Sequence, residues 1–214
     1  MEPHKLKAAA AGVLALAAAG SMTACTTAVG APMQPAGRMN MGRDMGSVQS
    51  MVAAWPEPSR MAAMDMMKKY GPPQEVTASM LMWKNNGPWK WTRVFRETVP
   101  HNFPMPHPDL LEQAIDYQVP VDRFDDLARY DGSVIVERTK GQMSARCDKE
   151  PANFLALNLA HDVATGRKTV EAARAYYAAA IKRFMATKQM DPYMQGLQFQ
   201  MAPQNARDPD RAVI

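Results

Sequence analysis

The chain is poor in cysteine, in aromatic residues and in long apolar runs. It has 214 residues with two cysteines, too few for a disulfide scaffold, and 7% aromatic residues. A hydrophobic fraction of 47% and a charged fraction of 21% exclude collagen-like, wholly disordered and multi-pass membrane chains. The formal charge of +4 comes without a dense basic block, so we expect no nucleic-acid partner.

The N-terminus has the pattern of an export signal. A short polar start that includes Lys5 and Lys7 precedes an apolar run over residues 8–19. This run is too short to span a bilayer as a stable anchor, and small residues follow it. We therefore expect the protein to be exported.

A cysteine directly follows the small residues. Residues 21–25, Ser-Met-Thr-Ala-Cys, resemble a bacterial lipobox. The resemblance implies that residues 1–24 are a lipoprotein signal peptide and that Cys25 carries a diacylglycerol. It also implies the periplasmic face of the outer membrane, because Thr26 stands where inner-membrane retention uses Asp. The alternative is an ordinary secretory signal and a protein released into the periplasm.

After the leader, composition divides the chain into three segments. Residues 25–54 are rich in Met, Pro and Gly, with few branched apolar residues, so we expect a flexible tether. Residues 55–190 carry the apolar periodicity of an ordered domain. For the polar residues 191–214 we expect a loosely ordered tail.

The start of the domain has a helical pattern. Ser59 is a candidate N-cap, and Met61, Met64 and Met67 recur at helical spacing, which predicts a short helix that buries these methionines.

Two hairpins are predicted next. Residues 80–83 and 89–97 alternate around a turn at 85–88, and residues 133–138 and 142–147 alternate around a second turn.

Between the hairpins we expect an extended proline-rich surface loop over residues 99–108 and a short helix over 121–130. Residues 110–119 fit a helix or a strand. Two helices follow, one over 153–165 and one capped by Thr169. The order predicts one α+β domain, in which two antiparallel hairpins pack against a short N-terminal helix and a C-terminal helix pair.

One junction resembles a known family. Residues 69–76, Lys-Tyr-Gly-Pro-Pro-Gln-Glu-Val, lead from a helix into the strand that holds Trp83. They are similar to the helix-to-strand joint of small lipoproteins of the outer-membrane protein assembly machinery, which implies an envelope protein as partner. The chain as a whole resembles an uncharacterised bacterial lipoprotein family, and this resemblance implies no activity.

The segment before and within the first helix is dense in methionine. Thioether sulfur suits Cu(I), and a flexible chain that carries Met39, Met41 and Met45 can place three sulfurs around one ion. This predicts a soft-metal site with copper as its ion. The alternative is that methionine serves here as flexible filler and as the buried helix face, with no cofactor at all.

Two histidines occur in the proline-rich loop. His101 and His107 are six residues apart and can share a binding site only if the loop bends, with Asp109 as a third metal ligand. The alternative is that both are structural or surface histidines.

Cys147 has no partner for a disulfide once Cys25 is lipidated, and we expect it to be buried. A cysteine-dependent enzyme is the alternative, with Arg146 lowering the thiol pKa and His161 beside Asp162 as the base.

Three tryptophans surround the first turn. We expect Trp89 and Trp91 to face the core and Trp83 to reach outward. These aromatics are interpreted as core packing, so the proline-rich loop, which is already extended, is the better recognition surface.

Together these features predict a lipid-anchored envelope protein that works through protein contacts in the periplasm and is not an enzyme. Copper handling by the methionine-rich tether is the first alternative, and a cysteine-dependent enzyme is the second.

Overall fold

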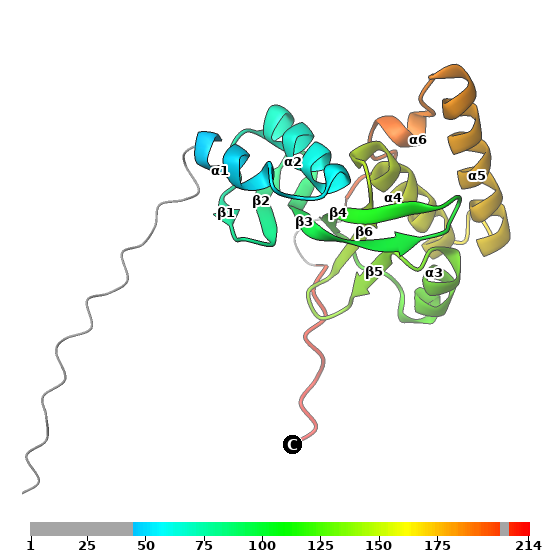
Figure 1. The fold of residues 1–214 in the computed structure, drawn as a ribbon. Helices are drawn as coiled ribbons and strands as arrows, with labels where there is room; N and C mark the ends of the chain where they lie inside the picture. Colours follow the sequence, from blue (N-terminus) through cyan, green and yellow to red (C-terminus); the bar gives the residue numbers. More distant parts are fainter. Residues whose placement is uncertain (1–44, 202–205) are drawn as a thin grey trace, which may run out of the picture. The chain divides into compact units, whose positions relative to one another are not determined.

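Six antiparallel strands form one sheet in the order β1-β2-β3-β4-β6-β5, and helices cover it (Figure 1). The computed structural model describes residues 45–201 and 206–214. The strands are β1 (Glu75–Val76), β2 (Met80–Asn86), β3 (Trp89–His101), β4 (His107–Asp116), β5 (Val134–Glu137) and β6 (Gln142–Cys147). The helices are α1 (Met45–Val52), α2 (Glu57–Tyr70), the 3-10 turn η1 (Val121–Arg123), α3 (Phe124–Tyr130), α4 (Glu150–Ala164), α5 (Val170–Thr187) and α6 (Pro192–Gln195).

The predicted α+β class is confirmed, and both predicted hairpins are present. β2 and β3 pair around Gly87, and β5 and β6 pair around Gly141, each glycine having a positive φ that favours this residue. The last long helix also begins as predicted, because the Thr169 hydroxyl accepts a hydrogen bond from the amide of Ala172. No helix among the described residues is both long and apolar enough to cross a membrane.

The proline-rich segment is the tip of a third hairpin, and not the separate surface loop that we expected. β3 runs on to His101 and pairs with β4, which also shows that residues 107–116 form a strand. The prolines are tolerated because Pro100 lies opposite Pro108 beyond the ends of β2 and β6. There the hairpin has no further strand neighbour, so the absent proline N–H groups leave no ladder bond unmade.

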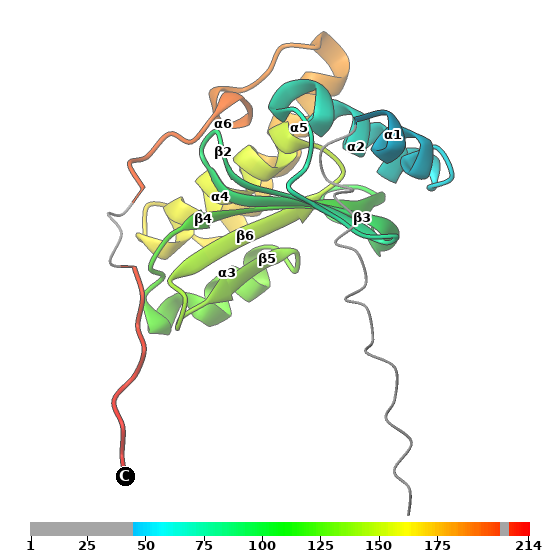
Figure 2. The same cartoon turned by 90° about the vertical axis from the view of Figure 1, so that its left-hand side faces the viewer.

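The helices α2 and α4 lie on the same side of the sheet. Leu111 and Ile115 of β4 share a face, because side chains alternate along a strand. Leu111 packs in the cluster with Met66 and Met67 of α2, whereas Ile115 packs in the cluster with Phe154 of α4. Figure 2 shows α2 and α4 next to each other above the strands. The sheet therefore supports two adjoining cores on one face.

The buried face of α2 differs from the prediction. Met61 and Met64 are 56% and 42% exposed, whereas Ala62, Ala63 and Met66 are buried together with Met67. The small alanines allow a close approach to the sheet and turn the other two methionines outward. Ser59 does not cap the helix, since its hydroxyl donates to the carbonyl of Arg96 on β3.

The ordered domain begins earlier than residue 55. Residues 45–52, which we assigned to the flexible tether 25–54, form α1. Its Val48 and Val52 are buried in the α2 cluster together with Trp55. This short helix is stable because two valines and one tryptophan pack against α2.

The segment assigned to a loose tail also belongs partly to the domain. Asp191 caps α6 by accepting from the amide of Tyr193, and Met194 is buried. The side-chain amide of Asn158 in α4 donates to the carbonyls of Tyr193 and Gly196. Residues 191–196 are therefore held on α4, which the polar composition of this segment did not reveal.

The prediction that Trp83 points outward is wrong. Trp83 is fully buried, and its indole N–H donates to the carbonyl of Gly71 at 2.9 Å. Trp89 is also buried, stacked on Phe154 with ring centres 4.6 Å apart. Trp91 is half-buried and lies beneath the guanidinium of Arg93. The indole donor thus fastens the helix-to-strand joint to β2.

Glu150, the first residue of α4, is the polar centre of the fold. Its buried carboxylate accepts from Trp89 Nε1 at 2.7 Å and from Gln113 Nε2 at 3.1 Å, and also from Lys69 and Tyr70 at the end of α2. Burial alone would raise the pKa of Glu150, but these donors outweigh it and lower the pKa. One carboxylate therefore connects α2, β3, β4 and α4.

Replacing Glu150 with Ala should lower the free energy of unfolding by about 3 kcal/mol, because buried donors lose their acceptor. Glu171→Ala is the matched control, since Glu171 also lies in the first turn of a helix but is exposed, and it should change stability by about 0.5 kcal/mol or less. Urea denaturation followed by circular dichroism measures both. Equal effects of the two substitutions would contradict the central role of Glu150.

Candidate functional site

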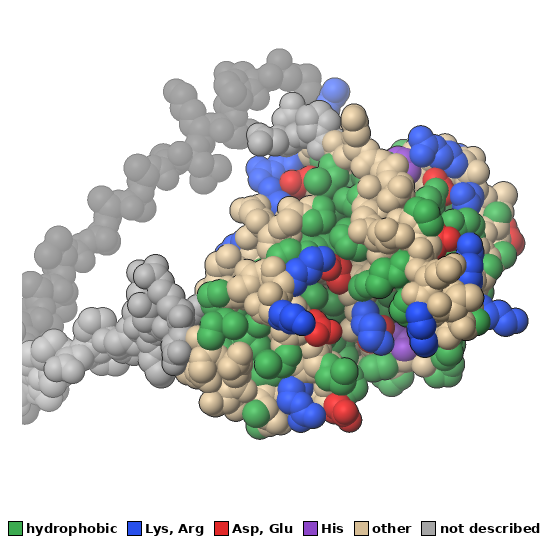
Figure 3. All heavy atoms as spheres, turned by 90° about the horizontal axis from the view of Figure 1, so that it is seen from above, with side chains coloured by type: hydrophobic (Ala, Val, Ile, Leu, Met, Phe, Trp, Pro, Cys, Tyr) green, Lys and Arg blue, Asp and Glu red, His purple; other side chains and the backbone are tan. Residues whose placement is uncertain are grey.

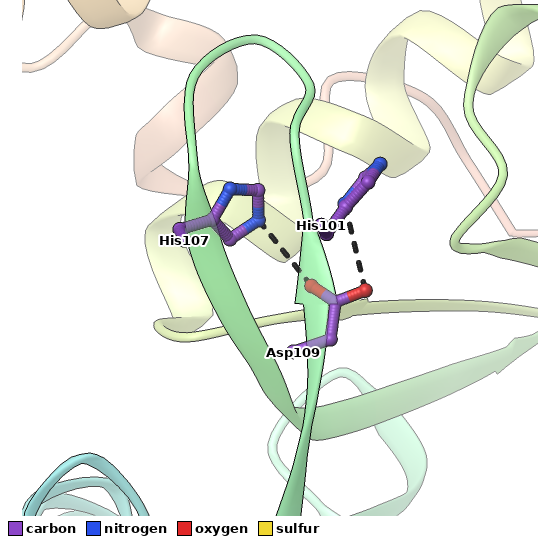
Figure 4. A group of neighbouring side chains, drawn as sticks. All are labelled: His101, His107 and Asp109. Carbon is purple, nitrogen blue, oxygen red and sulfur yellow. Dashed lines mark ion pairs between the residues drawn. The ribbon is translucent and has the colours of Figure 1, made fainter.

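The tip of the β3–β4 hairpin gathers three side chains that bear metal-binding or proton-carrying groups. His101 lies directly opposite His107 in the strand register, and Asp109 follows two residues along β4 on the same face as His107. Figure 4 shows both imidazoles turned toward the carboxylate of Asp109. The pairing of the strands, which the sequence did not predict, brings the predicted histidines together.

The three side chains lie close to one another. His101 Nδ1 is 3.5 Å from Asp109 Oδ2, and His107 Nε2 is 3.3 Å from Asp109 Oδ1. One ligand atom from each residue lies within 4.8 Å of the others. Each histidine thus faces its own oxygen of a single carboxylate.

The nitrogen atoms that face away from Asp109 also have polar neighbours. His107 Nδ1 lies 2.8 Å from the carbonyl of Met105, so this nitrogen carries a hydrogen and donates it. His101 Nε2 is 3.6 Å from Asp131 Oδ1. Asp131 is itself held by the amide of Ser133 at 2.9 Å. Each imidazole ring is therefore held in its orientation by a polar contact at the nitrogen that faces away from Asp109.

The cluster is enclosed. Asp109 is 1% exposed, and its other polar neighbours are the Ser133 hydroxyl, which donates to Oδ2, and Arg146 Nε at 3.9 Å. Asp109 and Cys147 raise the pKa of His107 to about 11. Burial raises the pKa of the Cys147 thiol in spite of its contact with His107. Cys147 is thus buried, as predicted, and protonated at neutral pH.

An apolar groove of about 500 Å³ adjoins this cluster on the side of His107. One wall is the proline-rich tip, with Pro104 and Met105, and the other is α5 with Ile181, Phe184 and Met185. Met105 and Met185 are 42% and 53% exposed. Figure 3 views the side of the molecule where α5 and α6 lie and shows hydrophobic side chains at the surface between Lys and Arg side chains.

Of the three predicted soft-metal ligands, the structure describes only Met45. Met39 and Met41 lie outside the described residues, as does Cys25. Met45 begins α1 and packs against the buried α2 cluster. Its side chain is therefore part of the domain and does not lie on a flexible tether as we expected.

The cysteine constellation is not assembled as proposed. The polar neighbours of Cys147 are His107, Asp148 and Tyr177, whereas His161 contacts Tyr117 and Phe199. Cys147 does have a neighbouring histidine that contacts a carboxylate, but these residues are His107 and Asp109 and not the predicted His161 and Asp162. Asp131 and Ser133 also belong to this site, and our sequence reasoning did not select them. The Asp-Gly-Ser turn that contains them is the only local signal.

No protein-family model, curated protein or solved structure matches the chain. The resemblances to lipoprotein families therefore stay predictions.

His161 of α4 contacts the segment that follows α6. Its ring stacks on Phe199 with centres 4.2 Å apart, and Nδ1 lies 2.7 Å from the Tyr117 hydroxyl, which donates to it when the ring is neutral. Burial and the nearby Arg167 lower the pKa of His161. The folded protein therefore resists protonation of this ring more than the unfolded chain does.

Acidification from pH 7 to pH 5 should destabilise the wild type relative to a His161→Phe variant. Because the folded pKa lies below the usual 6.5, the contribution of His161 is present above pH 6.5 and is lost as the pH falls toward the folded pKa. Phe preserves the stack on Phe199 but cannot titrate. Urea unfolding at several pH values checks this, and parallel stability curves for the two proteins would contradict it.

Proposed function

We propose that this protein is a lipid-anchored cell-envelope protein that binds an apolar segment of a partner protein in the groove between the β3–β4 tip and α5. The observation that carries the proposal is the groove itself. An exposed apolar patch is what separates a domain that works through contacts from one with a fully polar surface.

The lining of the groove suits a peptide segment. Methionine side chains adapt to the shape of a bound side chain, and Met105, Met185 and Met190 are all exposed along it. The proline-rich wall, which also holds Met105, contains Pro104 and Pro106, whose backbone angles are restricted before any partner arrives. Binding therefore costs little ordering on that wall, which favours affinity.

Charged side chains at the edges of the groove indicate which charge a partner segment should carry. Lys182 lines a smaller pocket that shares Met105 and Met185 with the groove, and no ion pair engages it among the described residues. Lys149 on the other margin is paired with Asp148. An apolar segment flanked by an acidic residue therefore complements the groove best.

A displayed random-peptide library panned against the full chain should enrich apolar peptides that carry an acidic residue. Binding of these peptides should weaken about tenfold or more in Met185→Asp, because charge enters the apolar wall. Met61→Asp is the matched control, since Met61 is equally exposed but lies on α2, away from the groove. Fluorescence anisotropy measures the affinities.

Equal binding to the wild type and to Met185→Asp would contradict the proposal, as would a library without enrichment. Displacement of an environment-sensitive dye from the groove by palmitate, but not by any enriched peptide, would point instead to a lipid ligand.

The lipid anchor rests on the lipobox-like sequence and has its own test. Replacing Cys25 with Ser should abolish incorporation of labelled palmitate and move the protein from the membrane pellet to the soluble fraction, because no acyl chain is attached. Cys147→Ser is the matched control and should remain lipidated. Membrane association that survives in Cys25→Ser would overturn lipid anchoring at this residue.

A further inference from the structure

The imidazoles of His101 and His107 and the carboxylate of Asp109 converge at the hairpin tip, and we propose that they bind a divalent transition-metal ion of the zinc type. This inference is independent of the groove and its partner.

The spacing of the ligand atoms fits such an ion. In a tetrahedral zinc site, with bonds of about 2.0–2.1 Å, ligand atoms lie about 3.3 Å apart. The nitrogen–oxygen distances here are 3.3 Å for His107 and 3.5 Å for His101. Small side-chain rotations are enough to close the three donors around one centre, since all lie within 4.8 Å of one another.

Two buried atoms in the cluster have no hydrogen-bond partner. They are His107 Nε2 and Asp109 Oδ1, which face each other 3.3 Å apart as an ion pair that lacks hydrogen-bond geometry. The Asp109 side chain is 1% exposed, so water cannot satisfy it from the bulk. An unsatisfied buried carboxylate oxygen is costly, and a cation between these two atoms would satisfy both.

The outward nitrogens have the contacts expected behind a metal site. Metal-binding histidines donate their second N–H to a carbonyl or a carboxylate, which fixes the ring and its tautomer. His107 does so to the carbonyl of Met105. His101 directs Nε2 toward the carboxylate of Asp131.

The donor set selects the class of metal. Two nitrogens and one oxygen suit zinc and its neighbours, whereas calcium and magnesium prefer oxygen and Cu(I) prefers sulfur. Asp109 and Asp131 place two carboxyl groups at the cluster, against the one guanidinium of Arg146 that lies 3.9 Å from Asp109. The fourth position would be taken by a water molecule that enters with the ion, or by Cys147, which contacts His107 and would release its thiol proton to solvent on binding.

The test uses the untagged full chain after chelator treatment. Isothermal titration with Zn²⁺ should show one ion per chain in the wild type and in His161→Gln, a matched control in which a histidine outside the cluster is removed. Binding should be lost in the double variant His101→Gln/His107→Gln. It should weaken about 10–100-fold in Asp131→Asn, which only orients a ligand.

Cobalt spectroscopy on the wild type makes the test independent of whether the variants fold. Bound Co²⁺ should show the intense visible bands of a tetrahedral site, and a thiolate charge-transfer band should appear only if Cys147 is the fourth ligand. The proposal is overturned by a weak octahedral spectrum, or by zinc binding that survives in a folded double variant. Either result would leave a protonated His107 paired with Asp109.

Discussion

A single buried carboxylate, that of Glu150, holds the two halves of the core together. The α2 cluster and the α4 cluster share one face of the sheet and have separate sets of buried apolar side chains, and half-buried Tyr70 packs against both. Glu150 lies at their junction and receives donors from both sides. Because a buried charge is costly when its hydrogen bonds are incomplete, the loss of donors from either cluster destabilises Glu150, and this couples the two clusters. Two of the donors, Trp89 and Gln113, lie on β3 and β4, the strands whose far ends form the hairpin tip with the histidines.

Local chemistry was sufficient to predict much of the fold. The two hairpins followed from alternating side chains around turns that contain Gly87 and Gly141, and the start of α5 followed from Thr169 as its cap. These features depend on residues close in sequence. α1 could not be predicted in the same way, because its order depends on Val48 and Val52 meeting a helix that its own composition does not reveal.

For the cluster at the hairpin tip, the residues could be predicted from the sequence but their arrangement could not. His101, His107 and Asp109 were recognised as candidate ligands, but the five residues between the two histidines, two of them prolines, gave no reason to expect strand pairing. Their meeting depends on the register in which His101 lies opposite His107. Asp131 and Ser133 arrive from the turn before β5, so only the tertiary fold brings them behind the histidines.

That register passes through an irregularity in β3, where Val94 pairs with Leu111 and Val99 with Asp109. Five steps along β3 therefore match two steps along β4, a surplus of three residues. Directly paired residues of antiparallel strands point to the same side, so the facing of His101 follows from its pairing with His107. Without the three extra residues, the register in which Val94 lies opposite Leu111 would place Thr98, and not His101, opposite His107. The length of this short stretch is thus as much a part of the cluster as the histidines themselves.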